Sequence, residues 1–305
     1  MPHRVIDLFA GCGGMTRGFK DSGSFEPVQA VEFDPDAAET YGHNFGDEHV
    51  EPLSIDRVRN FAAAEVIVGG PPCQGFSRLN KWREETPSRQ LWREYLRVVG
   101  TVRPAVFVME NVPQLLDSPE FADFRRHAEG LEYVIRTGVL NAADFGVPQR
   151  RRRAIAIGAL GVRDTSEVPW PVATHGAAGL PPWKTVREAF AEIPREPDGL
   201  LWHRPRRPRP MSLVRYSHVP ADGGNRHQMR VSLDAMGLDD YVPRCWREHS
   251  TGNHDVFGRM WWDRPAPTIR TEFFKPEKGR YLHPEEDRAI TIREGAALQS
   301  LEDII

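Results

Sequence analysis

Short runs of apolar, β-branched residues alternate with amphipathic stretches along the first half of the chain. Continuous apolar runs are typical of strands buried on both faces of a parallel sheet. Residues 91–102 instead repeat apolar side chains at helical spacing. The pattern therefore predicts an α/β fold built on a doubly wound, mostly parallel sheet. Strands are predicted at 4–10, 28–33, 66–68, 105–109, 133–141 and 154–158, and helices from 15 and at 37–45, 91–102, 121–128 and 290–301.

The pattern changes near residue 160, where Pro, Trp, Arg and Gly replace the hydrophobic runs. We therefore predict a first domain at 1–160, a smaller loop-rich domain at 161–262, and a return segment at 263–305 that packs on the first domain. Within the return segment, Thr291 and Glu294 form the spacing of a capping box at a helix start.

Composition narrows the possible classes of partner. The 305 residues include 40 Lys and Arg against 43 Asp and Glu, a formal net charge of -3. A wholly basic nucleic-acid binder is excluded, so contact with a polyanion must come from local patches. Cys12, Cys73 and Cys245 show neither a disulfide framework nor zinc spacing, which indicates a reducing cytoplasm. We expect no signal peptide and no membrane partner, because no apolar stretch approaches membrane-span length.

The first predicted strand runs into a glycine-rich turn, Gly11 to Gly14, and then a helix. Strand, glycine turn and helix N-terminus form a cradle for a nucleotide cofactor, although the same turn can simply allow close helix packing. Lys and Ser/Thr are not placed as in a phosphate-binding loop, which disfavours a triphosphate. Glu32 ends the second strand roughly 20 residues later, where a ribose-binding acid is expected.

The run 66–68 stops abruptly at two glycines and two prolines, which places Cys73 just past the carboxyl end of a buried strand. Ligands bind at that edge of an open α/β sheet. Cys73 is therefore a candidate nucleophile, and the alternative is a structural cysteine beside a turn. The polar residues 77–89 are expected either to close over a substrate or to form an ordinary surface loop.

Two further groups of polar residues adjoin predicted strands. Glu110 follows the strand at 105–109, and we expect it to be partly buried and to donate a proton; the alternative is a surface carboxylate. Arg150 to Arg153 run into the next strand, which would put alternate guanidinium groups on opposite faces. One pair could hold a phosphate or a pyrimidine carbonyl, or the run could be a solvated face. Basic residues mixed with aromatic residues in 161–262 fit either a nucleic-acid surface or a loop-rich insert.

The ordered series of these motifs resembles the DNA (cytosine-5) methyltransferase family. The matching segments are DLFAGCGG (7–14), Glu32, GGPPCQGFS (69–77), ENV (110–112), QRRRR (149–153) and TIREGAALQ (291–299). The resemblance implies an S-adenosylmethionine-dependent, Rossmann-like methyltransferase domain and a target recognition domain at 161–262. It also implies methyl transfer to carbon 5 of a flipped-out cytosine in a specific double-stranded DNA sequence. The reaction would pass through a covalent Cys73 adduct at C6 and release S-adenosylhomocysteine.

The resemblance assigns roles residue by residue. The implied catalytic residues are Cys73, Glu110, Arg151 and Arg153. The implied cofactor-binding residues are Phe9, Ala10, Gly11, Gly13, Gly14, Glu32, Phe33, Ile55, Asp56, Gly70, Pro72 and Leu91. The residues expected at DNA are Gln74, Ser77, Arg78, Arg226 and Arg230.

Two segments depart from the family pattern. The adenine-contacting Asp-Ile pair is replaced by Ser54-Ile55-Asp56, and no Gly-Asn-x-Val segment follows Leu301. We therefore expect a second chain or a further tail to complete the cofactor pocket. A bacterial restriction-modification or related defence role is implied, with a cognate nuclease as partner and a cytoplasmic, nucleoid-associated location. Methylation of RNA and a non-catalytic, partner-dependent DNA-binding subunit are the alternatives.

Overall fold

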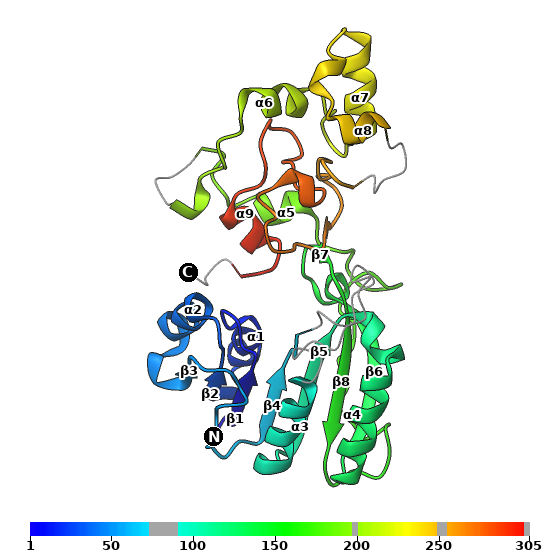
Figure 1. The fold of residues 1–305 in the computed structure, drawn as a ribbon. Coiled ribbons are helices and arrows are strands. Elements are labelled where there is room, and N and C mark those ends of the chain that lie inside the picture. The colour runs from blue at the N-terminus through cyan, green and yellow to red at the C-terminus, as the bar shows by residue number, and fades with distance from the viewer. Residues whose placement is uncertain (73–90, 197–200, 249–254, 302–305) are drawn as a thin grey trace. The chain divides into compact units, whose positions relative to one another are not determined.

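A computed structural model describes residues 1–72, 91–196, 201–248 and 255–301. The chain forms two compact units (Figure 1). The first unit comprises Met1–Leu140 and Arg152–Val172, and the second comprises Asn141–Arg151 and Ala173–Ile304. Among the described residues, no helix is both long and apolar enough to cross a membrane.

Seven strands of the described residues form the sheet of the first unit, in the order β3-β2-β1-β4-β5-β8-β6. β1 pairs in parallel with β2 and β4, while β5 pairs in parallel with β4 and antiparallel with β8. The order reverses direction between β1 and β4, so this is the switch point at which α/β sheets bind ligands. The strands are β1 His3–Leu8, β2 Phe25–Val31, β3 Val50–Glu51, β4 Val66–Gly69, β5 Val106–Asn111, β6 Val134–Asn141 and β8 Arg152–Ala159.

Helices cover both faces of this sheet (Figure 1). Alternate residues of a strand point to opposite faces. Val5, Val66 and Val68 accordingly pack against the first helix, whereas Ile6 and Phe107 belong to the core beneath the third and fourth. The elements are α1 Gly14–Asp21, α2 Pro35–Phe45, α3 Leu91–Val102 and α4 Pro119–Gly130, with short 3-10 turns η1 Asp47–His49 and η3 Pro113–Asp117.

The second unit consists of short helices and irregular segments around two apolar clusters. One cluster gathers Val186, Phe190, Met260, Ala266, Ile269, Tyr281, Ile290 and Leu298, and the other gathers Tyr216, Val219, Met229, Leu233, Val242, Phe257 and Leu282. Its helices are α5 Val186–Phe190, α6 Pro210–Ser217, α7 Arg226–Ala235, α8 Arg244–Glu248 and α9 Ile292–Ala297. The strands β7 Gln149–Arg150 and β9 Ala266–Pro267 pair in parallel, and 3-10 turns occur at η4 Ala142–Phe145, η5 Leu201–His203, η6 Asp239–Tyr241 and η7 Pro276–Lys278.

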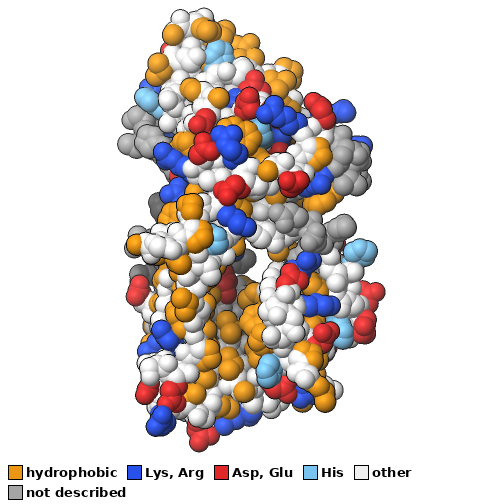
Figure 2. Space-filling model, turned by 180° about the vertical axis from the view of Figure 1, so that it is seen from behind, with side chains coloured by type: hydrophobic (Ala, Val, Ile, Leu, Met, Phe, Trp, Pro, Cys, Tyr) orange, Lys and Arg blue, Asp and Glu red, His pale blue; other side chains and the backbone are white. Residues whose placement is uncertain are grey.

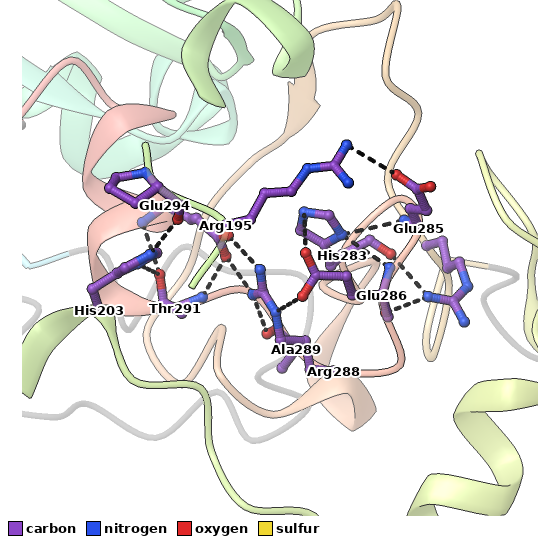
Figure 3. A network of polar contacts seen from close by, with 11 residues as sticks. Arg195, His203, His283, Glu285, Glu286, Arg288, Ala289, Thr291 and Glu294 are labelled. Carbon is purple, nitrogen blue, oxygen red and sulfur yellow. Dashed lines mark hydrogen bonds and ion pairs between the residues drawn. The ribbon is translucent and has the colours of Figure 1, made fainter. Parts of the chain in front are cut away.

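A buried polar network supports the second unit (Figure 3). Arg288 forms an ion pair with Glu294 at 2.7 Å and another with Glu286 at 2.6 Å. His203 lies 3.2 Å from the Thr291 hydroxyl, and Thr291 and Glu294 form the predicted capping box of α9. Because each of these charges has a partner inside the unit, the network offsets the desolvation cost of burying them.

The compact units differ from the predicted ranges. Residues 161–172 remain with the first unit, where Val168 packs against Ile157 and Ala159. Residues 263–301 belong to the second unit, in which Ile269, Tyr281, Ile290 and Leu298 fill one of the apolar clusters. The role given to each predicted range remains a prediction.

The predicted α/β sheet is confirmed, but several strands have other bounds than predicted, as β2 does at both ends. β1 stops at Leu8 because Phe9 adopts a left-handed conformation with φ 59°. β5 continues through Glu110 and Asn111 because these two residues pair with β8. The arginine run does not enter a single strand, since β7 ends at Arg150 and β8 begins at Arg152.

Candidate active site

The glycine turn after β1 leaves its backbone open on one side. Gly11 and Gly13 have φ values of 56° and 92°, which favour glycine. A Cβ on Gly13 would lie 2.2 Å from the Phe45 ring, whereas one on Gly11 or Gly14 would meet no atom within 4 Å. Gly13 therefore serves packing, while Gly11 and Gly14 present backbone that a ligand can approach.

Glu32 connects this turn to the start of α2. It lies just past β2 and is 8% exposed. Its Oε2 accepts a hydrogen bond from the Gly11 N–H at 2.8 Å, and its Oε1 accepts one from the Asp34 N–H at 2.9 Å. Phe33 is 67% exposed beside it. A carboxylate held by two amides next to an exposed aromatic ring fits a ribose and an adenine, so these residues fit the predicted nucleoside cofactor.

A buried polar group beneath the turn has no counterpart in the sequence prediction. Asp7 on β1 is 1% exposed, and the Thr16 hydroxyl donates to its Oδ2 at 2.7 Å. The Tyr41 hydroxyl lies 3.1 Å from Thr16. Burial raises the pKa of Asp7 to about 7, although the hydrogen bond from Thr16 opposes the shift. Only the position of Asp7 in the DLFAGCGG segment could have drawn attention to it.

The segment that leads to Cys73 is tied to the end of β5. The Asn111 side chain is buried, and its Nδ2 donates to the Pro71 carbonyl at 2.8 Å. A Cβ on Gly70 would lie 3.2 Å from Glu110 Oε2, so the diproline segment passes close to the Glu110 carboxylate. Cys73 itself lies outside the described residues. Asn111 belongs to the ENV motif, but sequence reasoning gave it no role.

Glu110 and Arg153 form an ion pair with 2.7 Å between Glu110 Oε1 and Arg153 Nε. Their side chains are 27% and 21% exposed, so the pair is partly screened from water. Arg151 belongs to the second unit, where its guanidinium donates to the Ile269 carbonyl at 3.4 Å. The structure thus groups Arg153 with Glu110, and the catalytic role of Arg151 stays a prediction.

The remaining predicted cofactor residues differ in accessibility. Ile55 is 3% exposed and belongs to the main apolar core of the first unit. Ala10 is also buried and belongs to a smaller apolar cluster. Asp56 is exposed and accepts a hydrogen bond from the Ser54 hydroxyl. Leu91 begins α3 and packs against the core, and Pro72 is half-buried. Contact of these residues with a cofactor stays a prediction.

The predicted DNA residues fall on two segments. Arg226 and Arg230 lie one turn apart on α7, and Arg226 sits 5.1 Å from the centre of the Trp246 ring. Gln74, Ser77 and Arg78 lie outside the described residues. Figure 2 shows Lys and Arg interspersed with Asp and Glu across the visible face of the molecule.

Comparison with known proteins adds independent information. The Type II methyltransferase M1.HphI of Haemophilus parahaemolyticus is 34% identical over 316 residues, which cover 98% of this chain and 77% of that protein. The Type II methylase M.HgiDII of Herpetosiphon aurantiacus is 31% identical, with coverage of 97% and 83%.

Solved structures share the fold. A prophage-encoded protein of E. coli matches with a TM-score of 0.62 and 24% identity over 97% of this chain and 88% of that chain. The Entamoeba histolytica methyltransferase EhMeth matches with a TM-score of 0.56 and 15% identity over 99% and 93%.

A family model described as "C-5 cytosine-specific DNA methylase" matches residues 3–304. That match spans both units and every motif identified in the sequence. The chain therefore belongs to the C-5 cytosine-specific DNA methylase family and is a DNA (cytosine-5)-methyltransferase.

Proposed function

We propose that the protein transfers a methyl group from S-adenosylmethionine to carbon 5 of a flipped-out cytosine in a specific DNA sequence, through a covalent Cys73 adduct at C6. The observation that carries the proposal is the Glu110–Arg153 ion pair, which lies beside Gly70 and the diproline segment that leads to Cys73. A nucleophile and an acid group on neighbouring strand ends can act on one ring.

Cytosine carbon 5 is a poor nucleophile, and addition of the Cys73 thiolate to carbon 6 converts the ring to an enamine whose carbon 5 can attack a methyl group. Charge that develops in the ring must be balanced at N3, where Glu110 is the candidate proton donor and takes the proton back when the ring is restored. Arg153 holds the Glu110 carboxylate in place through its Nε. Loss of the C5 proton, with water as the acceptor, then expels Cys73 and restores the ring.

The residues of the glycine turn would hold the methyl donor. S-adenosylmethionine supplies an electrophilic methyl group and leaves as S-adenosylhomocysteine. Glu32 would accept hydrogen bonds from the ribose, because its two oxygens are already oriented by Gly11 and Asp34. Phe33 would stack on the adenine, since it is exposed beside Glu32.

A cytosine inside a duplex is out of reach of these side chains, so the base must be flipped out at a cost of a few kcal/mol. We assign recognition of the sequence around it to residues 161–262. The two relatives described above carry Type II names, which supports a role in restriction-modification with a cognate nuclease. That role places the enzyme in the cytoplasm, at the bacterial nucleoid.

Tritium transfer from labelled S-adenosylmethionine to DNA tests the proposal, and bisulfite sequencing of DNA from expressing cells identifies the methylated site. Cys73→Ser should abolish transfer and retain DNA binding, whereas Cys245→Ser on α8 is the matched control, lies outside the predicted catalytic and cofactor residues, and should keep transfer. Turnover by Cys73→Ser would exclude the covalent route. Methylation of transfer RNA without methylation of DNA would exclude DNA as the substrate.

A further inference from the structure

The second unit contains an arginine-lined cavity that the chemistry described above does not use. Its volume is about 490 Å³, within the usual size of a ligand pocket. We call it the arginine cavity. Its lining includes Arg206, Arg207, Arg209, Arg215, Met211, Tyr216, Phe274 and Glu277.

Positive charge in the arginine cavity is poorly balanced. Four arginines face one glutamate. Arg206, Arg207 and Arg209 are exposed, and no ion pair to any of them occurs in the part of the chain that the structure describes. By contrast, the largely buried Arg259, Arg280 and Arg288 of the second unit each form an ion pair with a carboxylate. Guanidinium groups that crowd together without counterions repel one another, and an anion between them would relieve that repulsion.

The backbone holds these arginines in an ordered arrangement. Pro205, Pro208 and Pro210 alternate with them and fix φ at every second or third residue. Arg209 has φ -69° and ψ 154°, which is polyproline II geometry, and α6 begins directly after it. Arg206 and Arg209 both line the cavity, and a polyproline II segment repeats every three residues. Little backbone entropy is therefore lost when they bind a ligand.

The chemistry of the lining selects the class of anion. Every cation in it is arginine, whose planar group binds phosphate through two parallel hydrogen bonds. Arg215 is itself anchored, since its Nε donates to the Tyr241 carbonyl at 2.6 Å. Met211 and Phe274 are 50% and 36% exposed and give the cavity an apolar wall next to the charges. A phosphate group attached to sugar rings matches both the arginine side chains and the apolar wall.

We propose that the arginine cavity binds backbone phosphates of the DNA on which this methyltransferase acts, which makes Arg206, Arg207 and Arg209 the principal phosphate contacts of the second unit. The inference rests on the proposed function for the identity of the ligand. The residues predicted at DNA from the sequence were Gln74, Ser77, Arg78, Arg226 and Arg230, and of the two that the structure describes, neither Arg226 nor Arg230 lines this cavity.

The test compares the salt dependence of DNA binding between variants of the full chain. The triple variant Arg206→Gln, Arg207→Gln, Arg209→Gln removes the three guanidinium groups and leaves the predicted catalytic and cofactor residues intact. Each phosphate contact contributes about 0.9 to the slope of log K against log salt, so the slope should decrease by about 2 to 3, with affinity lower on the order of 100-fold at about 0.1 M salt. Fluorescence anisotropy with a mixed-sequence duplex measures both quantities.

A matched control separates this site from net charge. Arg103→Gln, Arg126→Gln, Arg163→Gln removes three exposed arginines of the first unit, each paired with a carboxylate. It should change the slope by less than about 0.5. The triple Arg→Lys variant at 206, 207 and 209 should keep most of the slope but lose affinity, because lysine keeps the charge and lacks the bidentate geometry. An unchanged slope in the folded Gln variant, or an equal loss in the control, overturns the inference.

Two additional arms identify the ligand and separate this inference from the proposed function. Calorimetry with inorganic phosphate and with a nucleoside triphosphate should show at most weak binding. The inference is overturned if the wild type binds either compound tightly, the Gln variant at 206, 207 and 209 alone loses that binding, and the salt slope of DNA binding stays unchanged. That result would assign the cavity to free phosphates. Tritium transfer is measured on the same proteins. Wild-type protein that binds DNA through these arginines but methylates none supports the inference while refuting the proposed function.

Discussion

Substitution of Asp7 by asparagine tests whether a buried carboxyl group sets the pH dependence of stability in the first unit. Burial raises the pKa of Asp7 to about 7 from the ordinary value of 3.8. Between these two values the native state keeps a proton that the unfolded chain releases. The stabilisation is therefore complete at low pH and is lost as the pH rises through 7.

The expected magnitude follows from that difference in pKa. Between pH 5.5 and pH 8.5, ionisation of Asp7 should lower the free energy of unfolding by about 2 kcal/mol, since each unit of pKa is worth about 1.4 kcal/mol. Asp7→Asn keeps an oxygen that can accept from Thr16 but cannot ionise. Its free energy of unfolding should fall about 2 kcal/mol less over this range, whatever constant offset its amide group introduces.

Urea unfolding at pH 5.5, 7.0 and 8.5 measures the effect in the wild type, Asp7→Asn and the control Asp36→Asn. Asp36 is exposed on the first turn of α2, so its variant should follow the wild type. Parallel pH curves for the wild type and Asp7→Asn would refute the reasoning, because they would show that the native state binds no more protons at Asp7 than the unfolded chain does between pH 5.5 and 8.5.

Three further predictions follow from individual contacts. Asn111→Ala removes the buried bond to the Pro71 carbonyl and should cost about 1–3 kcal/mol of unfolding free energy and reduce kcat, whereas an unchanged kcat would separate Asn111 from the catalytic segment. Cys12 is exposed in the glycine turn, so S-adenosylmethionine should slow its alkylation several-fold in peptide mass spectrometry; equal rates would place the cofactor elsewhere. Burial, followed by the nearby Arg288 charge, lowers the pKa of His283 to about 4, so the unfolded chain takes up a proton first as the pH falls. Between pH 7 and pH 5 this should reduce stability by about 2 kcal/mol, and His283→Asn should flatten the acid limb in calorimetric melting; an unaltered limb would contradict it.

Local sequence was sufficient wherever neighbouring residues decide the structure. The helix predicted at 91–102 has those bounds in α3, because its apolar spacing matches a single buried face. Thr291 caps α9 with the predicted partner Glu294, since capping bonds span only two or three residues. Glycine and proline likewise marked the end of β4.

Prediction was wrong where a distant strand determines the outcome. Glu110 and Asn111 extend β5 because β8, more than 40 residues away, supplies an antiparallel partner. The arginine run is divided between two units because Gln149 is buried and bonds to Ile269 and Leu298, over a hundred residues away. No local pattern encodes these pairings.

The sequence by itself determined the class of fold, the family through its ordered motifs, and the positions of the glycine turn and its acidic partner Glu32. These features depend on short-range periodicity and on residue types that a fixed chemistry requires. Only the tertiary structure decided that Arg153 pairs with Glu110, that Asn111 holds Pro71, and that Asp7 is buried with a raised pKa. Distances and burial arise when segments far apart in the chain pack together, and the free energy of a charge depends on that packing.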